Sequence, residues 1–471
     1  VSPELEGQTM RSLLQQQEAA VLTLLEQQTG NLVVTYPCAD QLDDRERFPS
    51  QLFLRIFRLT AELPEGDLQD CESWLPAPLG PDTAWCRLTD TENWLNQWPE
   101  QPYKDALFKK DFLWLCRGAY ALKERASFRF TEHDGLVPEA GHLFGPKSSR
   151  VHSANSLQTY GKCPQQFYLQ HVLQLSLPEE EALEPGRWLH PLVRGQLLHT
   201  VFHRYHLELK QKKRKPDLVQ DRALLHRLLQ EELQKLEPTL PVVATPTRQL
   251  EMQELLETMN LFLGEEVLWA ERYQPRYFEV NLGGKPEELP SELDDSAPQE
   301  IALPSGRTIL LQGRIDRIDL VLGGDGRTYF IWDYKTGKMN EFLQAQAHAR
   351  GQHLQPLLYL EMVEQRLQQV HGPKARVEGA GYFFPGQKGG QGDRLVWQAA
   401  DLRKHKSLID TLIDLQQAGV FLATDRKETC EHCPFRDACD VPEVNRQAVN
   451  KLKKPELPVL HALRSLRKAK E

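Results

Sequence analysis

Apolar and polar residues alternate along residues 329–337, and this period of two is typical of a strand. The preceding stretch, residues 312–319, is rich in β-branched residues and also predicts a strand. A Gly-Gly-Asp-Gly sequence at residues 323–326 lies between the two stretches and predicts a tight turn. We therefore expect an antiparallel hairpin.

One face of this hairpin carries charge. Asp333 and Lys335 are two residues apart and share a strand face, and the neighbouring strand brings Asp316 beside them. An Asp–Lys pair is most often a solvated salt bridge of little energetic value. Apolar neighbours on both sides favour partial burial instead, and a buried acidic cluster needs a metal ion or another cation. Carboxylates, a divalent ion and a lysine are the groups that together catalyse phosphodiester hydrolysis.

Apolar residues at intervals of three and four predict helices in much of the remaining chain. The predicted helices cover residues 5–28, 51–59, 189–215, 221–236 and 247–270, with two more beginning at Ser153 and near Gln352. Further short strands are predicted at residues 32–37, 277–282 and 379–385. Strands interspersed with helices predict an α/β protein with a mixed central sheet.

Composition sets limits on partners. The chain has 471 residues, of which 40% are hydrophobic, enough for two or three domains. Its formal charge of -9 gives no overall attraction to nucleic acid, so any DNA contact has to come from local basic clusters. No stretch of about 18 apolar residues occurs, so we expect no membrane span, and no export signal is recognisable near the start.

Two local basic clusters occur. The first ends the helix predicted at residues 189–215, and the second lies in residues 441–471. The cationic residues are Lys210, Lys212, Lys213, Arg214 and Lys215 in the first cluster, and Lys451, Lys453, Lys454, Arg464, Arg467, Lys468 and Lys470 in the second. Each cluster either holds DNA phosphates or forms a solvated surface, and the second is alternatively a partly disordered end.

Three of the eight cysteines, Cys430, Cys433 and Cys439, are clustered at C-x2-C-x5-C spacing. Thiols this close suit a soft metal in a reducing compartment better than a disulfide framework, so we expect a cytoplasmic protein. Cys163 is the natural fourth ligand, and its participation would restrict the unfolded chain by closing a long loop. Spacing alone leaves zinc and a [4Fe-4S] cluster open.

Several motifs together resemble the PD-(D/E)XK nucleases, in the branch that contains RecB-type, AddB-type and CRISPR-adaptation nucleases. They are Gly313-x-x-Asp316, Asp333-Tyr334-Lys335, Gly195-x-x-x-His199 and Gln355-x-x-x-Tyr359. The lone Cys163 before a proline, combined with the C-terminal cysteine triplet, resembles the iron-sulfur staple of the same nucleases. This resemblance favours a [4Fe-4S] cluster over zinc.

The resemblance implies a restriction-endonuclease-like core with a divalent metal site. His199, Asp316 and Asp333 would bind Mg²⁺ or Mn²⁺, helped by the backbone carbonyl of Tyr334. Glu279, on the strand predicted at residues 277–282, is either a further acidic residue near this site or a solvated residue of an edge strand.

The remaining motif residues would act on the substrate. Lys335 would position the attacking water, and Gln355 and Tyr359 would hold the scissile strand. His203 is the alternative to the histidine ligand, because it lies one helical turn further on. Asp319 is the alternative to the first aspartate if the strand register differs. The iron-sulfur cluster would be structural.

The N-terminal part has a different resemblance. A helix, a strand, an Arg-rich loop with Arg45 and Arg47, and a Pro-Ser turn resemble the end of a superfamily 1 helicase motor in AddB-type subunits. We therefore expect a helicase-like α/β segment and linker over residues 1–150, a PD-(D/E)XK nuclease module over residues 151–440, and a basic tail over residues 441–471.

These observations predict a metal-dependent DNA nuclease, an exonuclease acting on DNA ends or single strands in recombination and repair. A helicase subunit is the expected partner, and no membrane is involved. Two alternatives stay open. The chain is otherwise a non-catalytic DNA-binding or scaffolding subunit of a helicase–nuclease complex, or a zinc-stabilised interaction protein.

Overall fold

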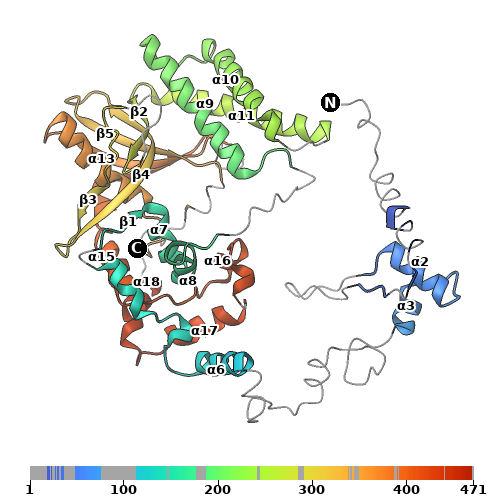
Figure 1. The fold of residues 1–471 in the computed structure, drawn as a ribbon. Helices are drawn as coiled ribbons and strands as arrows, with labels where there is room; N and C mark the ends of the chain where they lie inside the picture. The colour runs from blue at the N-terminus through green and yellow to red at the C-terminus, as the bar shows by residue number, and fades with distance from the viewer. Residues whose placement is uncertain are drawn as a thin grey trace. The chain divides into compact units, whose positions relative to one another are not determined.

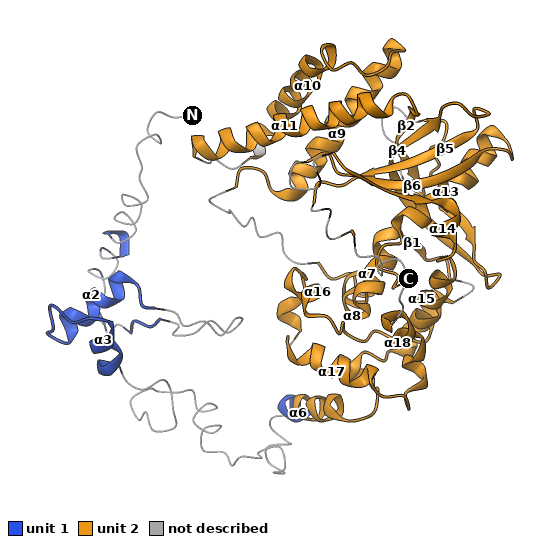
Figure 2. Ribbon diagram, turned by 180° about the vertical axis from the view of Figure 1, so that it is seen from behind, with its two compact units in different colours: residues 1–117 blue, residues 118–471 orange. Residues whose placement is uncertain are grey.

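The protein divides into two units, residues 1–117 and 118–471, which are described separately (Figure 2). The computed structural model describes residues 48–75, 113–145, 148–176, 187–240, 244–284, 291–337, 350–386, 392–439 and 441–468, and isolated positions between 19 and 36 and between 339 and 390. No helix in these ranges combines the length and the apolar composition needed to cross a bilayer.

The first unit contains two short helices, α2 (Gln51–Thr60) and α3 (Leu68–Trp74). Ser50 accepts a hydrogen bond of 3.2 Å from the Phe53 amide and caps α2, so the helix predicted at residues 51–59 is confirmed. Phe53, Phe57 and Cys71 are buried in a small core between the two helices.

Other predictions for this unit are only partly covered by the structure. Residues 33–36 of the predicted strand at 32–37 are described, and they belong to no strand. Most of the predicted helix at residues 5–28, and the loop with Arg45 and Arg47, lie outside the described residues. The helicase-like character of residues 1–150 stays a prediction.

The second unit is built on a mixed seven-stranded sheet, as the α/β prediction requires. Its strands are β1 (Val151–Ser153), β2 (Tyr273–Leu282), β3 (Gln299–Ala302), β4 (Thr308–Val321), β5 (Thr328–Tyr334), β6 (Arg376–Phe383) and β7 (Arg394–Gln398). The strand order is β1-β4-β5-β6-β7, and β2 and β3 also pair with the long β4. The pairs β1–β4 and β5–β6 are parallel and the others antiparallel.

The predicted hairpin is confirmed. β4 pairs antiparallel with β5 from Arg317 opposite Trp332 to Leu320 opposite Tyr329. The turn between them contains two glycines with positive φ, a conformation that side chains with a Cβ rarely adopt.

Twelve α-helices are described in and next to the second unit. They are α6 (Leu113–Ala126), α7 (Ala154–Lys162), α8 (Pro164–Phe167), α9 (Pro191–Lys212), α10 (Gln220–Leu236), α11 (Thr245–Trp269), α13 (Gln355–His371), α14 (Ala399–Arg403), α15 (Ser407–Gln417), α16 (Lys427–Glu431), α17 (Glu443–Leu452) and α18 (His461–Lys468). Short 3₁₀ helices occur at Glu132–Asp134, Pro138–Phe144, Glu237–Thr239, Arg436–Ala438 and Pro458–Leu460, and a π-helical turn at Tyr168–Val172.

The helices cover both faces of the sheet (Figure 1). On one face, α9, α10 and α11 pack on the aromatic side chains Phe330, Trp332 and Tyr334 of β5. On the other face, α13 packs on a second core that includes Ile331 of the same strand. The predicted strand pattern is therefore confirmed, because the side chains of neighbouring β5 residues point alternately into the two cores.

The C-terminal segment is part of the fold, so the expectation of a solvated or disordered end is wrong for three of its cations. Lys451 is 2% exposed, and its ammonium lies 3.0 Å from a carboxylate oxygen of Asp134. Arg464 donates to the carbonyl of Leu452 at 2.7 Å. Arg467 donates to the carbonyl of Gly161 at 2.7 Å. The sequence does not reveal this, because a buried lysine or arginine that donates to backbone carbonyls and a solvated one are the same residue type.

Stability should depend on pH through His152, a residue of β1 that is 4% exposed. Burial, together with the nearby Arg150 guanidinium, lowers the pKa of His152 to about 4. Between pH ~6.5 and pH ~4 the imidazole is protonated in the unfolded state but not in the folded state. The free energy of unfolding therefore falls as the pH falls through this range.

Urea unfolding followed by circular dichroism should give a free energy of unfolding about 1.4 kcal/mol lower at pH ~5.5 than at pH ~7.5 from this residue alone. The His152→Gln variant should show a smaller difference by that amount. Equal pH dependence in both proteins would contradict the assignment.

Candidate active site

The two aspartates of the hairpin meet at the end of the β4–β5 ladder. The ladder ends at the pair formed by Arg317 of β4 and Trp332 of β5. Asp316 and Asp333 are the next residues beyond this pair, one on each strand. The Asp316 carboxylate accepts a hydrogen bond of 2.8 Å from the backbone amide of Tyr334. Asp316 and Asp333 are 9% and 6% exposed, so the predicted burial of this acidic pair is confirmed.

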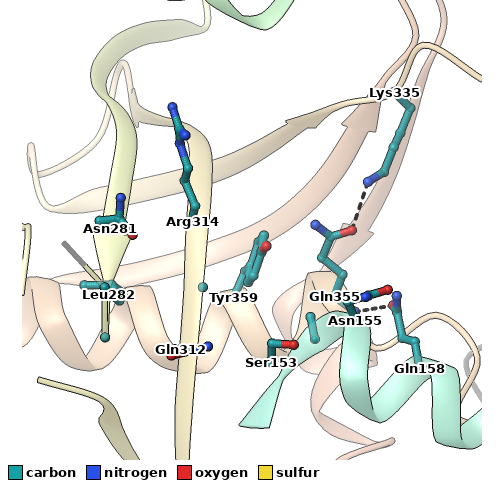
Figure 3. A pocket seen from close by; sticks show the side chains of 14 residues that line it. Ser153, Asn155, Gln158, Asn281, Leu282, Gln312, Arg314, Lys335, Gln355 and Tyr359 are labelled. Carbon is teal, nitrogen blue, oxygen red and sulfur yellow. Dashed lines mark hydrogen bonds between the residues drawn. The ribbon is translucent and has the colours of Figure 1, made fainter. Parts of the chain in front are cut away.

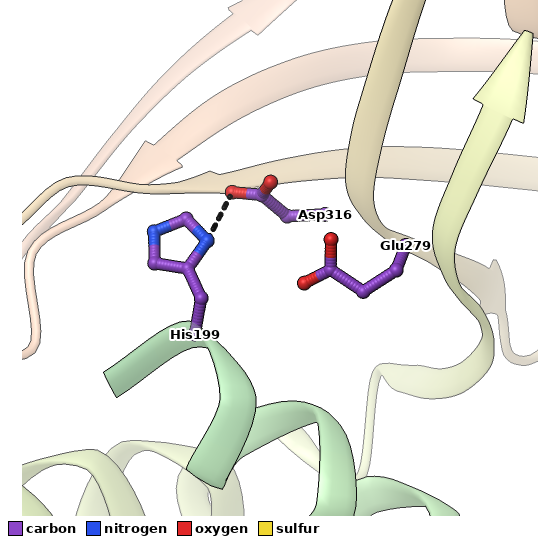
Figure 4. Close-up of side chains that lie close together, drawn as sticks. All are labelled: His199, Glu279 and Asp316. Carbon is purple, nitrogen blue, oxygen red and sulfur yellow. Dashed lines mark ion pairs between the residues drawn. The ribbon is translucent and has the colours of Figure 1, made fainter. Parts of the chain in front are cut away.

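His199 reaches these strands from α9. Its Nδ1 atom lies 3.5 Å from Oδ2 of Asp316, and its ring makes an edge contact with the Tyr334 ring at a centroid distance of 5.6 Å. Figure 4 shows the imidazole pointing from the helix toward the Asp316 carboxylate. The helix motif and the strand motif are thus brought together, although 117 residues separate them in the sequence.

Glu279 of β2 completes a three-residue group. One ligand atom each from His199, Glu279 and Asp316 lies within 4.8 Å of the other two (Figure 4). Glu279 has a φ of 49°, a strained value for a residue other than glycine, of the kind that clusters at functional sites. It is 6% exposed, so the alternative of a solvated edge residue is wrong.

Lys335 is held beside the second aspartate. Its Nζ atom lies 2.5 Å from Oδ2 of Asp333 and donates to Oε1 of Gln355 at 2.9 Å. The amide of Gln355 in turn donates to Oδ1 of Asp333 at 2.6 Å. This closed triangle fixes the ammonium next to the acidic group.

Tyr359 lies one helical turn after Gln355 on α13 and is 8% exposed. A Cβ atom at Gly313 would lie 2.9 Å from Cε1 of Tyr359, so the glycine of the Gly-x-x-Asp motif makes room for this ring. Burial and the Asp333 carboxylate raise the pKa of Tyr359, which keeps its hydroxyl protonated as a hydrogen-bond donor.

The pKa values of Glu279, Asp333 and His199 in this group are raised, as expected where buried negative charges lie close together. Burial and the nearby Asp316 carboxylate raise the pKa of Glu279 to about 7. Burial raises the pKa of Asp333 to about 6 even though Lys335 acts in the opposite direction. The pKa of His199 rises to about 9, because the Asp316 carboxylate outweighs the effect of burial, which by itself lowers it. Acids that hold protons near neutrality and an imidazole that gains one indicate a site that favours a cation.

This donor set fits a divalent metal. Two carboxylates and an imidazole converge from three different elements, and their ligand atoms lie close enough to share one ion. Oδ2 of Asp333 is buried and, beside its ion pair with Lys335, accepts no hydrogen bond from the described residues, so it retains a lone pair for a cation. The predicted roles of His199, Asp316, Asp333 and the Tyr334 carbonyl as ligands stay predictions.

A cavity of about 540 Å³ adjoins this group. Lys335, Gln355 and Tyr359 line it together with residues of β2, β4 and the start of α7, and α7 lies next to Gln355 (Figure 3). The side chain of Gln158 on α7 accepts hydrogen bonds from the backbone amides of Leu354 and Gln355, at 2.7 and 2.9 Å. Gln158 thereby caps α13 and holds Gln355 in place.

Sequence reasoning missed Gln158 and Arg314. Arg314 lines the same cavity and donates to Glu279 at 2.7 Å. No local signal marks either residue, because the partners of Gln158 lie 196 and 197 positions away and those of Arg314 depend on how β2 pairs with β4.

Two alternative ligands lie elsewhere. Asp319 is fully buried on the opposite face of β4, where it forms a bidentate pair with Arg317 at 2.6 and 2.7 Å. The guanidinium also donates to Glu266 of α11 at 2.6 Å. His203 packs on the Phe278 ring, with a centroid distance of 6.1 Å, and is absent from the three-residue group. The strand register therefore favours Asp316 over Asp319, and the side-chain positions favour His199 over His203.

The four cysteines of the predicted cluster come together from α7–α8 and the C-terminal segment. Burial, with a smaller contribution from the nearby Cys433 thiol, raises the pKa of Cys163 to about 11. Burial likewise raises the pKa of Cys439 to about 11, with contributions from Cys433 and Cys430. Each thiol thus lies near at least one other. Asn445 donates to Sγ of Cys430 at 3.4 Å, and the Gln166 amide donates to Sγ of Cys163 at 3.4 Å.

Comparison with known proteins agrees with this geometry. A family profile described as the PD-(D/E)XK nuclease superfamily matches residues 152–440. A protein of Symbiobacterium thermophilum, named as a subunit of an ATP-dependent helicase/deoxyribonuclease, is 36% identical over 135 residues, which are 28% of this chain and 11% of that protein.

Proteins of the same name from Desulfitobacterium hafniense and Clostridium botulinum are 25% identical over 285 and 237 residues, or 57% and 47% of this chain. The matched part covers only 22% and 18% of those two relatives. The chain is homologous to these helicase/deoxyribonuclease subunits over this part. The profile match covers more than half of the chain and contains every motif of the site, and the chain therefore belongs to the PD-(D/E)XK nuclease superfamily.

Proposed function

We propose that this protein is a metal-dependent DNA nuclease whose active site is the group around His199, Asp316, Asp333 and Lys335. One observation carries the proposal: an imidazole, two carboxylates and an ammonium from separate elements converge beside an open cavity. A buried structural salt bridge would need neither the histidine nor the cavity.

His199, Asp316 and Glu279 would hold Mg²⁺ or Mn²⁺, with Asp333 and the Tyr334 carbonyl completing the ligands. The ion, when bound, would polarise the phosphate and lower the pKa of a bound water. The ammonium of Lys335, fixed by Asp333 and Gln355, is placed to orient a water molecule and to offset the negative charge that develops on the phosphate.

The neighbouring cavity would hold the scissile strand. Gln355 and Tyr359 line it next to Lys335, and Arg314 brings a positive charge to the opposite wall. Gln158 fixes the start of α13, so that Gln355 keeps its place when the strand binds. The cavity is lined by mostly polar side chains, as a sugar–phosphate backbone requires.

The relatives named as ATP-dependent helicase/deoxyribonuclease subunits support action on DNA next to a helicase partner. A role in DNA repair and exonuclease action on DNA ends are further parts of the proposal. The four cysteines would bind a structural [4Fe-4S] cluster. A [4Fe-4S] cluster is proposed over zinc because four cysteines, one distant and three clustered, match the iron-sulfur arrangement that the sequence resembles. A cytoplasmic location stays a prediction.

The Asp316→Asn variant tests the metal-dependent mechanism. DNA labelled at its 5′ or 3′ end, single-stranded or duplex, should be degraded by the wild-type protein with Mg²⁺ or Mn²⁺ and not with EDTA. The variant should lose at least about a hundredfold in rate, because the amide removes one of the ligand charges.

Isothermal titration should show weaker Mn²⁺ binding by the same variant. The Asp393→Asn variant, with a substitution on the turn before β7, should keep the wild-type rate and metal affinity. A wild-type protein that binds DNA but does not cut it under any of these conditions would favour the scaffolding alternative.

A further inference from the structure

A second cavity, of about 590 Å³, lies at the C-terminal end of α9, far along the helix from His199. Its walls come from the end of α9, the residues after α11 and the start of β2. The cationic side chains that line it are Lys210, Lys213, Arg214, Lys215, Arg276 and Arg317, and Glu266 is the one acidic side chain in the lining.

Three of these cations are balanced by carboxylates within the fold. The pairs are Arg317 with Asp319 and Glu266, Arg214 with Asp221, and Lys215 with Glu271. These three cations therefore add little net charge, and the excess positive charge of the cavity comes from the remaining three side chains.

The other three cations, Lys210, Lys213 and Arg276, line the same cavity, and within the described residues no ion pair with a carboxylate is formed by any of them. The Lys210 ammonium donates to the Arg276 carbonyl at 2.9 Å and lies 5.7 Å from the centre of the Tyr277 ring. Burial and the Arg276 guanidinium lower the pKa of Lys210, and Glu292 offsets this only in part. Within the described ranges, the Lys213 ammonium forms no ion pair. Crowded cations in a hollow favour a ligand with several negative charges.

We propose that this cavity binds backbone phosphates of the same DNA strand that the active site cleaves, at a distance from the scissile phosphate. The proposal rests on the proposed nuclease function. α9 carries His199 near its middle and the cavity at its end. The fourteen residues from His199 to Lys213 span about 21 Å along the helix. Phosphates of one strand in duplex geometry are about 3.4 Å apart, so this span corresponds to about six of them.

Binding of fluorescein-labelled single-stranded and duplex DNA by the full chain, measured by fluorescence anisotropy in EDTA, tests the proposal without any cleavage. The Lys213→Gln/Arg276→Gln variant should bind roughly tenfold more weakly. The slope of log affinity against log salt should become shallower by about 1.4 to 1.8, or about 0.7 to 0.9 for each lost phosphate contact. Lys404→Gln, at an exposed residue paired with Asp401 outside this cavity, should change neither quantity.

A second measurement uses cleavage in Mg²⁺. Oligonucleotides shorter than about six residues cannot reach both sites, so the double variant and the wild type should degrade them at equal rates. Longer strands should be degraded more slowly by the variant. Equal salt slopes for wild type and variant, with both proteins folded by thermal melting, would overturn the proposal. If the double variant melts early, the exposed Lys213→Gln substitution alone should lower the slope by about half as much.

Two other outcomes are informative. If the wild type does not cleave DNA but still binds it more tightly than the double variant, the nuclease function is refuted and the phosphate-binding site is retained. Competition by free pyrophosphate at matched ionic strength separates the sources of phosphate. If the variant loses pyrophosphate binding but retains its affinity for DNA, the cavity serves a free phosphate and the proposal is wrong.

Discussion

Replacing Lys335 with methionine should lower the rate of DNA hydrolysis by about a hundred- to a thousandfold, in the range observed when one charge-stabilising donor is removed from an active site. Methionine has a similar length and shape but carries no charge. In the native protein the ammonium lies 2.5 Å from Asp333 and 2.9 Å from Gln355, so it is oriented before substrate binds. Initial rates on end-labelled DNA with Mg²⁺ measure the effect.

Lys404→Met is the matched control, because the Lys404 side chain is 72% exposed and its ion pair with Asp401 lies outside both cavities. This variant should keep the wild-type rate. Metal affinity, measured by titration, should change little in Lys335→Met, since the substitution leaves the ligands in place. A Lys335→Met protein that cuts DNA at the wild-type rate would rule out the proposed role of the ammonium.

If the proposed cluster is present, the Cys163→Ser variant should lose its iron and about 5 kcal/mol of unfolding free energy, because the cluster would close a loop of roughly 270 residues between Cys163 and Cys430 and so restrict the unfolded chain. A loss of this size should lower the melting temperature by roughly 10 °C. The measurements are iron content, visible absorbance and thermal unfolding of protein purified without oxygen.

Cys116→Ser provides the control for Cys163→Ser, because Cys116 lies on α6 and is not part of the cysteine group. It should leave iron content and melting temperature unchanged. A colourless wild-type protein that contains zinc would favour zinc over iron. Unchanged iron in Cys163→Ser would show that another residue supplies the fourth ligand.

The hairpin could be predicted from the sequence because its signals are local. The alternation around Trp332 and the glycine-rich turn both act within a few residues, and the structure realises both. The same holds for the Ser153 cap: its hydroxyl accepts from the Ser156 amide at 3.1 Å and starts α7. The register also separates Asp316 from Asp319, since strand geometry places them on opposite faces.

The rest of the site depends on contacts that the sequence does not encode locally. Glu279 joins the group only because β2 pairs with β4 and its backbone adopts a positive φ. Gln158 acquires its role from α13, nearly 200 residues later. The basic clusters were ambiguous for the same reason, since a lysine near a carbonyl and a lysine in solvent have the same sequence signature.

The hydroxyl of Tyr160, on α7, donates at 2.6 Å to the carbonyl of Val420, 260 residues later. During synthesis at about 5 to 20 residues per second, the first helix of the module waits roughly 13 to 52 s for this acceptor to leave the ribosome. β1 waits similarly for β4, its partner in the sheet. The start of the domain is therefore without these partners while synthesis continues, and the proposed iron-sulfur cluster could assemble only after Cys439 has been translated.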